Sequence, residues 1–468
     1  MSPKRRFVLF IILTGLFFIV TPGIILFSQG YLFDWQKFRL VQAGGIFVKT
    51  LPEEVSLAVK PESGTKEKKL ASKKSLLGPA GTLIKSLLPQ KYLVTVTPLD
   101  NQNISWQKEL EVSPLTVTKA SRIIFPKTNP EISAIAMTSS SINLVSLPEK
   151  NKKTVLYATE DNKIFSFENS TSSLIFDLKS LTGFPKAEKI TELSLSSSGK
   201  NFIAFSKTSG VIHVKDKGTF LIASFFRIFL KNEKTSLSQT RLVWHPENDN
   251  VLFALNQKGG YFFDLNTQEY SKFTEKNILG LTNNYFLDSS GEINNFDYTD
   301  KTAEKKIFET GLKSGRYQIS LIKDTDFLLK NESGELFLIF KNELKKISGN
   351  VSFFLLSFDG SRFVYGTESG EIFVYFLKDV FDDLAYKENE ILELGRVENL
   401  KTGYLANHNW HLIAVSNSAL AVFEIDKRLP INQYEIQLGP ISKIIEFAEP
   451  EIRWLDQNQN LKSAKIFP

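Results

Sequence analysis

The chain has 468 residues, of which 42% are hydrophobic and 12% aromatic, so most of it is expected to fold into two or three units. It contains no cysteine, which excludes disulfides, thiolate catalysis, iron–sulfur clusters, cysteine-based zinc sites and a lipid-modified N-terminal cysteine. The net charge of +6 comes from a basic cluster at residues 4–6 and a lysine-rich stretch at 60–91, so the remainder is net negative and a nucleic-acid-binding face is not expected.

An apolar run at residues 7–27 follows the basic cluster. It has no charged residue, and a helix of this length at about 1.5 Å per residue is long enough to cross the hydrocarbon core of a bilayer. The positive-inside rule predicts that the basic cluster stays cytoplasmic and the bulk of the chain lies outside. A cleaved signal peptide is the alternative, but its apolar region is normally shorter, and Ser28-Gln29-Gly30 matches a cleavage site poorly. We therefore predict an uncleaved, single-pass anchor in the cell membrane at residues 1–30.

The next segment, residues 31–127, is predicted to be a connector at 31–43 followed by a small β-domain. Residues 60–86 are rich in Lys, Ser and Gly and are expected to include a mobile loop. Strands are expected at 44–51, 55–59, 92–96 and 106–112, the last with clean alternation of apolar and polar residues.

Residues 42–125 resemble a PEGA domain, a small extracytoplasmic β-module often found after a membrane anchor. The resemblance is carried by the opening Gly-Gly-Ile-Phe-Val strand at 44–48, Pro52, the Leu-Pro-x-x-Tyr-x-Val-Thr-Val core at 88–96 and the Trp-x-x-Glu-Leu-x-Val strand at 106–112. Gln90 stands where the family has Gly, and the lysine-rich insertion lengthens the middle loop. The resemblance implies an envelope spacer without chemistry of its own.

Residues 128–468 are punctuated by regular turn signals. Ser-Gly-Glu occurs at 290–292, 333–335 and 369–371, each time between two apolar runs, and looser signals occur at 161–162, 209–210, 259–260, 417–418 and 458–459. Gly and Asn tolerate the left-handed backbone of tight hairpins, so these are hairpin tips. Eight tips spaced roughly 30 to 50 residues apart predict radial repetition of one small sheet, a β-propeller.

The repeat unit is clearest at residues 351–376, which read as strand, Asp-Gly turn, strand, Ser-Gly turn and strand, and 193–216 and 241–265 repeat it. The run at 336–340 is apolar on both faces, as expected of a sheet sandwiched between neighbours. The units resemble WD-repeat, TolB-like and quinoprotein-like blades without the full signature of any. The predicted fold is all-β, with eight blades or, because the first tip lacks Gly, seven. A pair of β-sandwiches explains the repeat less well.

Ring closure is predicted from the end of the chain. Only three strands are expected after Ile441, so the last blade needs a strand from the start of the domain, within residues 132–147.

Sequence signals for chemistry are few. His408 and His411 have the i, i+3 spacing of metal ligands on a helix, but 407–414 reads as a turn entering a strand and no acidic third ligand is near. His245, before Pro246, fits a turn; the fourth histidine is His213.

An Asp-Thr-Asp pair at Asp324 and Asp326 lacks the remaining ligands of a calcium loop, so solvated turn charges are expected there. The G-x-S-x-G nucleophile elbow, the P-loop, the dinucleotide fingerprint and the sialidase Asp-box are absent from the sequence. We predict no catalytic, cofactor or metal site.

The lysine-rich stretch at 60–91 has two interpretations. It is a solvated, flexible loop, or it attaches electrostatically to anionic lipid headgroups or acidic wall polymers near the anchor. The predicted role of the whole chain is binding or scaffolding of a protein or glycan partner at a cell envelope of bacterial type. The alternative is a hydrolase or lyase of envelope glycans or peptides, which requires carboxylates, His or a metal at one mouth of the propeller channel. A quinone-dependent dehydrogenase ranks third, because the chain has only 5 Trp and lacks that family's repeat signature.

Overall fold

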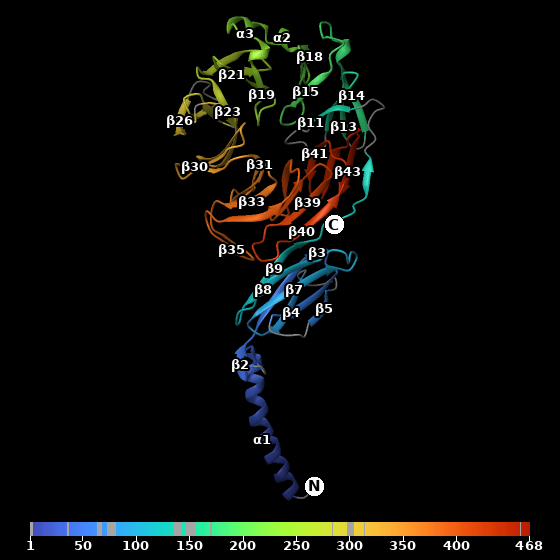
Figure 1. Cartoon of the computed structure of the whole chain (residues 1–468), viewed down its shortest axis with the longest axis vertical. Helices are drawn as coiled ribbons and strands as arrows, with labels where there is room; N and C mark the ends of the chain where they lie inside the picture. Colours follow the sequence, from blue (N-terminus) through green and yellow to red (C-terminus); the bar gives the residue numbers. More distant parts are fainter. Residues whose placement is uncertain are drawn as a thin grey trace.

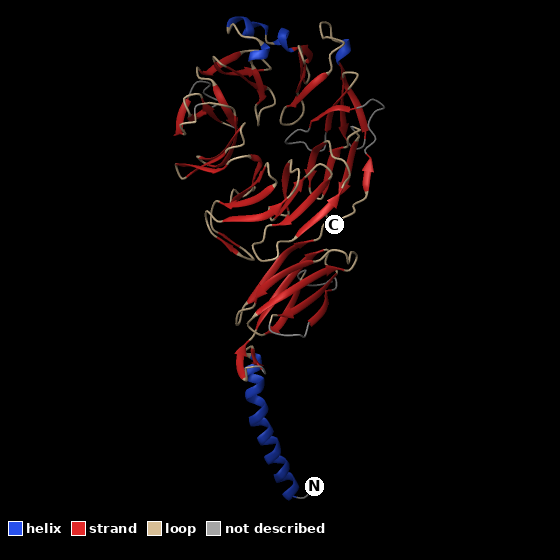
Figure 2. Cartoon of the chain, in the orientation of Figure 1, coloured by secondary structure: helices blue, strands red, loops and turns tan. Residues whose placement is uncertain are grey.

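The computed structural model describes residues 3–34, 37–62, 68–72, 81–134, 142–146, 155–168, 171–282, 284–296, 304–312, 314–458 and 460–468. A long N-terminal helix, a small β-module and a ring of sheets follow one another in space as they do in the sequence (Figure 1). Strands make up nearly all of the regular secondary structure after the first helix, with loops between them (Figure 2). The predicted all-β class is confirmed.

Helix α1 (Pro3–Ser28) coincides with the apolar run. Its segment Arg6–Ser28 has 23 residues, a mean hydropathy of 2.6 and no buried part, so by length and composition it is able to cross a membrane. A signal sequence has the same properties. A short hairpin, β1 (Tyr31–Asp34) with β2 (Arg39–Gln42), joins α1 to the module.

The small β-module consists of two sheets packed face to face. Their strand orders are β6-β3-β9 and β5-β4-β7-β8, and β3 pairs in parallel with β9. The strands are β3 (Gly44–Leu51), β4 (Val55–Pro61), β5 (Lys68–Ser72), β6 (Thr82–Leu87), β7 (Lys91–Pro98), β8 (Trp106–Glu111) and β9 (Val117–Ile124). The alternating residues of β4, β7 and β8 point one side chain in two into the core, as their sequence pattern predicts.

The prediction for residues 60–86 missed two strands. β5 pairs with the edge of β4, and β6 pairs with β3, so long-range sheet pairing orders lysine-rich sequence whose local composition indicates a loop. Residues 63–67 and 73–80, where the rest of that predicted loop falls, lie outside the described residues.

Eight four-stranded antiparallel sheets form the ring within the described part of the chain (Figure 1). Blades 1 to 4 are β11 (Ile142–Ser146), β12 (Val155–Thr159), β13 (Lys163–Glu168), β14 (Thr171–Asp177); β15 (Ile190–Leu195), β16 (Phe202–Ser206), β17 (Gly210–Val214), β18 (Gly218–Leu221); β19 (Arg241–Trp244), β20 (Val251–Asn256), β21 (Gly259–Asp264), β22 (Tyr270–Thr274); and β23 (Ile278–Thr282), β24 (Tyr285–Asp288), β25 (Glu292–Phe296), β26 (Glu304–Glu309).

Blades 5 to 8 are β27 (Tyr317–Lys323), β28 (Asp326–Asn331), β29 (Leu336–Phe340), β30 (Glu343–Ser348); β31 (Val351–Leu356), β32 (Arg362–Thr367), β33 (Glu371–Phe376), β36 (Ile391–Arg396); β37 (Thr402–Ala406), β38 (His411–Val415), β39 (Ala419–Glu424), β40 (Gln433–Gln437); and β41 (Lys443–Ala448), β42 (Glu451–Leu455), β43 (Leu461–Lys465) with β10 (Ile132–Ala134).

The ring closes as predicted. β10, the first strand of the ring, pairs antiparallel with β43, the last, with Ile132 opposite Ala464. The terminal blade therefore combines both ends of the domain. Of the two predicted blade numbers, the structure has eight.

The first strands of the blades lie innermost. Those of neighbouring blades contact one another, as β11 does β15, β23 does β27 and β31 does β37. Middle strands such as β32 and β39 are buried along their whole length, which is the outcome expected when each sheet is covered by a neighbour on both faces.

Two insertions lie outside the four-stranded blades: a helical segment between blades 2 and 3, and a hairpin within blade 6. The sequence analysis predicted neither. α2 (Ile222–Phe225), α3 (Arg227–Asn232) and the 3-10 turn η2 (Leu237–Gln239) lie between blades 2 and 3, where Phe226 and Phe229 pack on Phe263. A second 3-10 turn, η1 (Leu178–Ser180), follows blade 1. The hairpin β34 (Val380–Phe381) and β35 (Ala385–Tyr386) interrupts blade 6 before its outer strand.

Candidate functional site

All eight predicted tips fall in the same hairpin, the one between the second and third strands of a blade. In every blade a polar residue at or just after the end of the second strand accepts a hydrogen bond from a backbone N–H of that hairpin. These residues are Thr159, Ser206, Asn256, Asp288, Asn331, Thr367, Ser416 and Asp456. Such side chains replace a ladder hydrogen bond at a tight turn. The recurrent structural signal is thus an accepting residue followed by a turn.

Glycine is required at the Ser-Gly-Glu tips. Gly291, Gly334 and Gly370 have φ of +83°, +80° and +91°. At Gly370 a Cβ would also lie 2.1 Å from the carbonyl oxygen of Val397. A side chain is therefore disfavoured there both by the positive φ and by the lack of space.

A basic recess of 870 Å³ opens on the hairpin side of blades 3, 4 and 5. Its walls are the segment 234–240 around η2, the starts of β19 and β23, the β20–β21 hairpin and the segment just before β27. Blades 3 and 4 are on the part of the ring away from the small module (Figure 1). The volume is in the range of ligand sites.

Four cations line the basic recess, and no Asp, Glu or His is among the described residues of its wall. The cations are Lys234, Arg241, Lys258 and Arg316. A second hollow of 450 Å³ shares Arg241 and Arg316, so these two side chains stand where the hollows meet. The basic recess therefore offers charge for binding but no carboxylate or imidazole pair for general acid–base chemistry.

The side chain of Arg241 has no hydrogen-bond or ion-pair partner within the described parts of the chain, although its backbone pairs with β20. Partial withdrawal from water and then the like charge of Arg316 lower the pKa of its guanidinium, while Glu192 and Glu332 act in the opposite direction. Arg316 Nε lies 4.0 Å from Glu332 Oε1, but both side chains are about two-thirds exposed or more, so this pair contributes little. The Arg241 guanidinium nevertheless stays charged at neutral pH.

Asn256 is the capping residue of blade 3 and also lines the basic recess. Its Oδ1 accepts the Lys258 N–H at 2.8 Å, but its buried Nδ2 has no hydrogen-bond partner among the described residues. A buried donor without an acceptor costs about 1–3 kcal/mol. Such a group next to four cations is a donor that an anionic ligand is able to satisfy.

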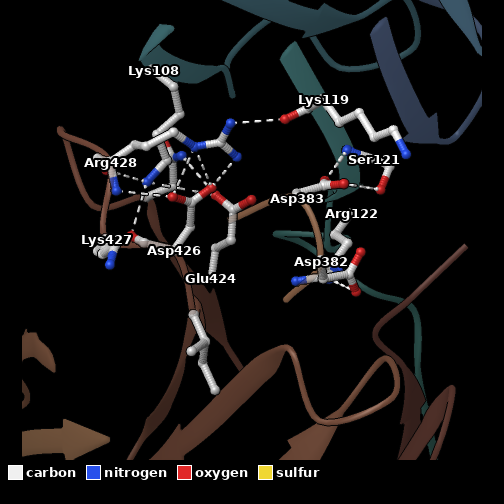
Figure 3. A network of polar contacts seen from close by, with 12 residues as sticks. Lys108, Lys119, Ser121, Arg122, Asp382, Asp383, Glu424, Asp426, Lys427 and Arg428 are labelled. Carbon is white, nitrogen blue, oxygen red and sulfur yellow. Dashed lines mark hydrogen bonds and ion pairs between the residues drawn. The ribbon is translucent and has the colours of Figure 1, made fainter. Parts of the chain in front are cut away.

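The joint between the small module and the ring is built differently, from buried charged side chains that contact one another and the backbone (Figure 3). Lys108, on β8, is fully buried, and its Nζ donates to the carbonyl oxygens of Arg428 (2.7 Å) and Asp426 (3.4 Å) and lies 3.8 Å from Glu424 Oε2. Trp106 Nε1 donates to the same Glu424 oxygen at 2.7 Å. Strand β8 is thus fastened to the loop that follows β39.

Burial is the largest influence on the pKa values of Lys108 and Glu424. It raises the pKa of Glu424, and the nearby charge of Asp426 adds to the rise, while Lys108 opposes it. Burial likewise lowers the pKa of Lys108, and Glu424 opposes that shift. Each group is tolerated in the interior because of its partners.

The β34–β35 hairpin holds strand β9 of the module from another direction (Figure 3). Ser121 donates from its backbone N–H (2.6 Å) and its hydroxyl to the Asp383 carboxylate, and Arg122 forms an ion pair with Asp382. The Arg122 guanidinium also lies 3.4 Å from the ring centre of Trp410. The module core and the cores of blades 7 and 8 form one continuous apolar cluster, so module and ring are a single packed body.

The sequence contained a signal for this joint. Trp106, Leu110 and Val112 point inward from β8 and its end, and Lys108 occupies an inward position of the same alternation. A lysine on a buried face needs partners, which the sequence does not identify.

The four histidines lie in blades 2, 3 and 7. His408 is exposed in the turn before β38, whereas His411 is buried with its Nδ1 3.0 Å from Asn407 Nδ2, so the predicted turn entering a strand is confirmed. His245 Nδ1 accepts the backbone N–H groups of Glu247 and Asn248, which confirms its turn position. His213 stacks on Phe202 inside blade 2.

Asp324 and Asp326 belong to the β27–β28 turn. Asp326 Oδ1 accepts the Lys341 backbone N–H at 2.9 Å, and Asp324 is exposed. Within the described residues, no group of three or more His, Asp or Glu is arranged to hold a metal ion.

The fold defines a class, an eight-bladed β-propeller carried behind a small β-module. Comparisons of the sequence with protein-family models and with curated proteins produced no match. Among solved structures, the C-terminal WD40 domain of Sif2 is similar at 12% identity over 72% of this chain and 99% of that one, with a TM-score of 0.49.

Two other solved structures are similar at the same distance. The computationally designed Ika8 protein has 10% identity and a TM-score of 0.44 over 73% of this chain and 100% of that one. The WD40 domain of SCAP from fission yeast has 10% identity and a TM-score of 0.41 over 72% and 98%. Matches this distant carry no argument about function, and the assignment of a propeller stands on the eight sheets and their closure.

Proposed function

We propose that this protein is a single-pass, membrane-anchored scaffold that holds a β-propeller on the extracytoplasmic side of a bacterial-type envelope to bind a protein or glycan. Residues 1–30 are the anchor, residues 31–127 a connector and PEGA-like spacer, and residues 128–468 the binding propeller. The role is non-enzymatic. The arrangement of an exposed apolar helix, a spacer and a propeller in series supports this proposal (Figure 1).

The joint between the small module and the ring is the observation that carries the proposal. It makes the spacer and the ring one body, so the anchor would restrict where the propeller faces and raise its local concentration at the membrane. A flexible tether would not need buried charges between the two parts.

Membrane extraction tests the anchor. The full chain should stay in the membrane pellet after washing with high salt or alkaline carbonate, whereas a chain lacking residues 1–30 should be released. Protease added to intact cells with a permeable outer wall should digest the propeller. Release of the full chain by salt, or digestion only after lysis, would refute the anchored, outward arrangement.

The lysine-rich stretch at 60–91 is a secondary contact in this proposal, with anionic lipid or wall polymer as its ligand. Each lysine near an anionic surface contributes about 1 kcal/mol, so binding of vesicles containing phosphatidylglycerol should fall with salt. Replacement of the lysines by Gln should abolish the salt dependence. Equal binding by the Gln variant would remove this contact.

A further inference from the structure

The cations of the basic recess differ from other cations on the same side of the ring. In blade 4, Lys276 lies 2.9 Å from Asp288 and 2.6 Å from Glu292, so its charge is neutralised within the protein. Arg241 has no such partner in the described structure, and Arg316 has only the distant, exposed Glu332. Within the described residues, Arg241 and Arg316 therefore lack the close carboxylate contacts that neutralise Lys276.

Two guanidinium groups close together repel each other, and an anion bound between them would offset this repulsion. Burial and then the charge of Arg316 lower the pKa of Arg241, and Glu192 and Glu332 oppose this shift. A guanidinium presents a planar fork of N–H donors that matches a carboxylate, and charge-assisted bonds of this kind are about twice as strong as neutral ones. The unpartnered Nδ2 of Asn256 adds a neutral donor in the same wall.

The rest of the wall indicates which kind of anion fits. It consists mainly of hydroxyl and amide side chains such as Thr235, Gln239 and Asn277, together with the aliphatic Leu255, Ile278 and Leu279, and has no aromatic ring among its described residues. A sugar ring or a nucleobase is normally held by stacking on an aromatic side chain. Amides and hydroxyls instead pair with the N–H and C=O groups of an extended peptide.

We propose that the basic recess binds an acidic segment of a partner protein, with one carboxylate held between Arg241 and Arg316. This inference rests on the proposed binding role of the propeller and specifies its ligand. The peptide backbone lies along the amide and hydroxyl wall formed by the β20–β21 hairpin and the start of β23.

Fluorescence anisotropy with the full chain in detergent tests the proposal. The probe is a labelled peptide of alternating Gly and Glu, and the matched probe replaces every Glu with Gln. The Glu peptide should bind more tightly than the Gln peptide, and its affinity should fall as salt rises. In the double variant Arg241→Gln and Arg316→Gln, Kd should rise by about tenfold or more, since charged hydrogen bonds are lost.

Arg227→Gln is the matched control, because Arg227 is exposed on α3 outside the recess wall and its loss removes the same type of charge. Its Kd should stay within about twofold of wild type. All variants should unfold at the wild-type temperature, which separates lost binding from lost folding.

Three results would overturn the proposal: equal binding of the Glu and Gln peptides, equal effects of Arg227→Gln and the double variant, or displacement by polygalacturonate of a site that ignores the Glu peptide. The last would make the ligand an acidic glycan. None of these affects membrane extraction, so failure of this inference and failure of the anchored scaffold are distinguishable.

Discussion

The joint and the basic recess are both rich in charged side chains, but they use them in opposite ways. At the joint, Lys108, Glu424 and Asp426 are buried and each has partners within the protein. At the basic recess, Arg241 and Arg316 are exposed and Asn256 keeps an unpartnered donor. Polar groups whose hydrogen bonds are satisfied within the protein stabilise the fold, whereas polar groups without a partner in the protein are available to a ligand.

The largest effect is expected at the joint. Lys108→Ala should lower the free energy of unfolding by about 3–5 kcal/mol, because it leaves Glu424 buried without its cation. Urea unfolding of the full chain in detergent, followed by tryptophan fluorescence, measures the loss. Lys91→Ala is the control, since Lys91 is exposed on the neighbouring strand β7.

A double variant sharpens this result. Lys108→Met with Glu424→Gln removes both charges and leaves an amide that is able to accept the Trp106 N–H, so most of the lost stability should return. A cost below about 1 kcal/mol for Lys108→Ala would mean that the joint is not held by its buried charges.

The second-largest effect is expected from acid, which should lower the folding stability through His411 on β38. Burial, and then the charge of Arg122, lowers the pKa of His411 from 6.5 to about 3. The unfolded chain therefore takes up a proton that the folded chain does not, and stability is lost as pH falls below about 6.5, by up to about 1.4 kcal/mol per unit. Between pH 7 and pH 5 this amounts to roughly 2 kcal/mol.

Comparison of variants isolates that contribution from other titrating groups. His411→Gln should reduce the pH 7 to pH 5 difference in unfolding free energy by roughly 2 kcal/mol, whereas His408→Gln, at an exposed position in the same turn, should leave it unchanged. The same acid response in wild type and His411→Gln would show that His411 is protonated in the folded protein.

The smallest effect is expected in the basic recess. Asn256→Ala should cost about 1 kcal/mol, because it removes the acceptor for Lys258 N–H. Asn256→Asp should cost less, since it keeps that acceptor and blades 4 and 8 use Asp at this position. Asn256→Asp should nevertheless weaken the Glu peptide, because it places a negative charge beside Arg241. Urea unfolding measures the stability of the two variants, and anisotropy measures peptide binding by Asn256→Asp. Equal losses of stability in Asn256→Ala and Asn256→Asp would contradict the role of Asn256 Oδ1 as an acceptor.

Much of the ring was predictable because its signals are local. Each tip needs a residue that tolerates a tight turn, and Gly370, with φ of +91° and no room for a Cβ, shows how strictly the backbone demands it. The predicted ring closure followed from counting strands. The α2–α3 insertion, the β34–β35 hairpin and strands β5 and β6 were missed, because their conformations depend on partners far away in the sequence.

The amino-acid sequence alone determined the apolar helix, the strand-rich architecture and the eight hairpin tips, since periodicity, run length and turn chemistry act over a few neighbouring residues. Only the tertiary structure decided that Lys108 meets Glu424 and that Arg316 lies close enough to Arg241 to act on its charge. Both pairs join residues that are distant along the chain. Their state of charge depends on burial and on neighbours, which exist only after the ring has closed.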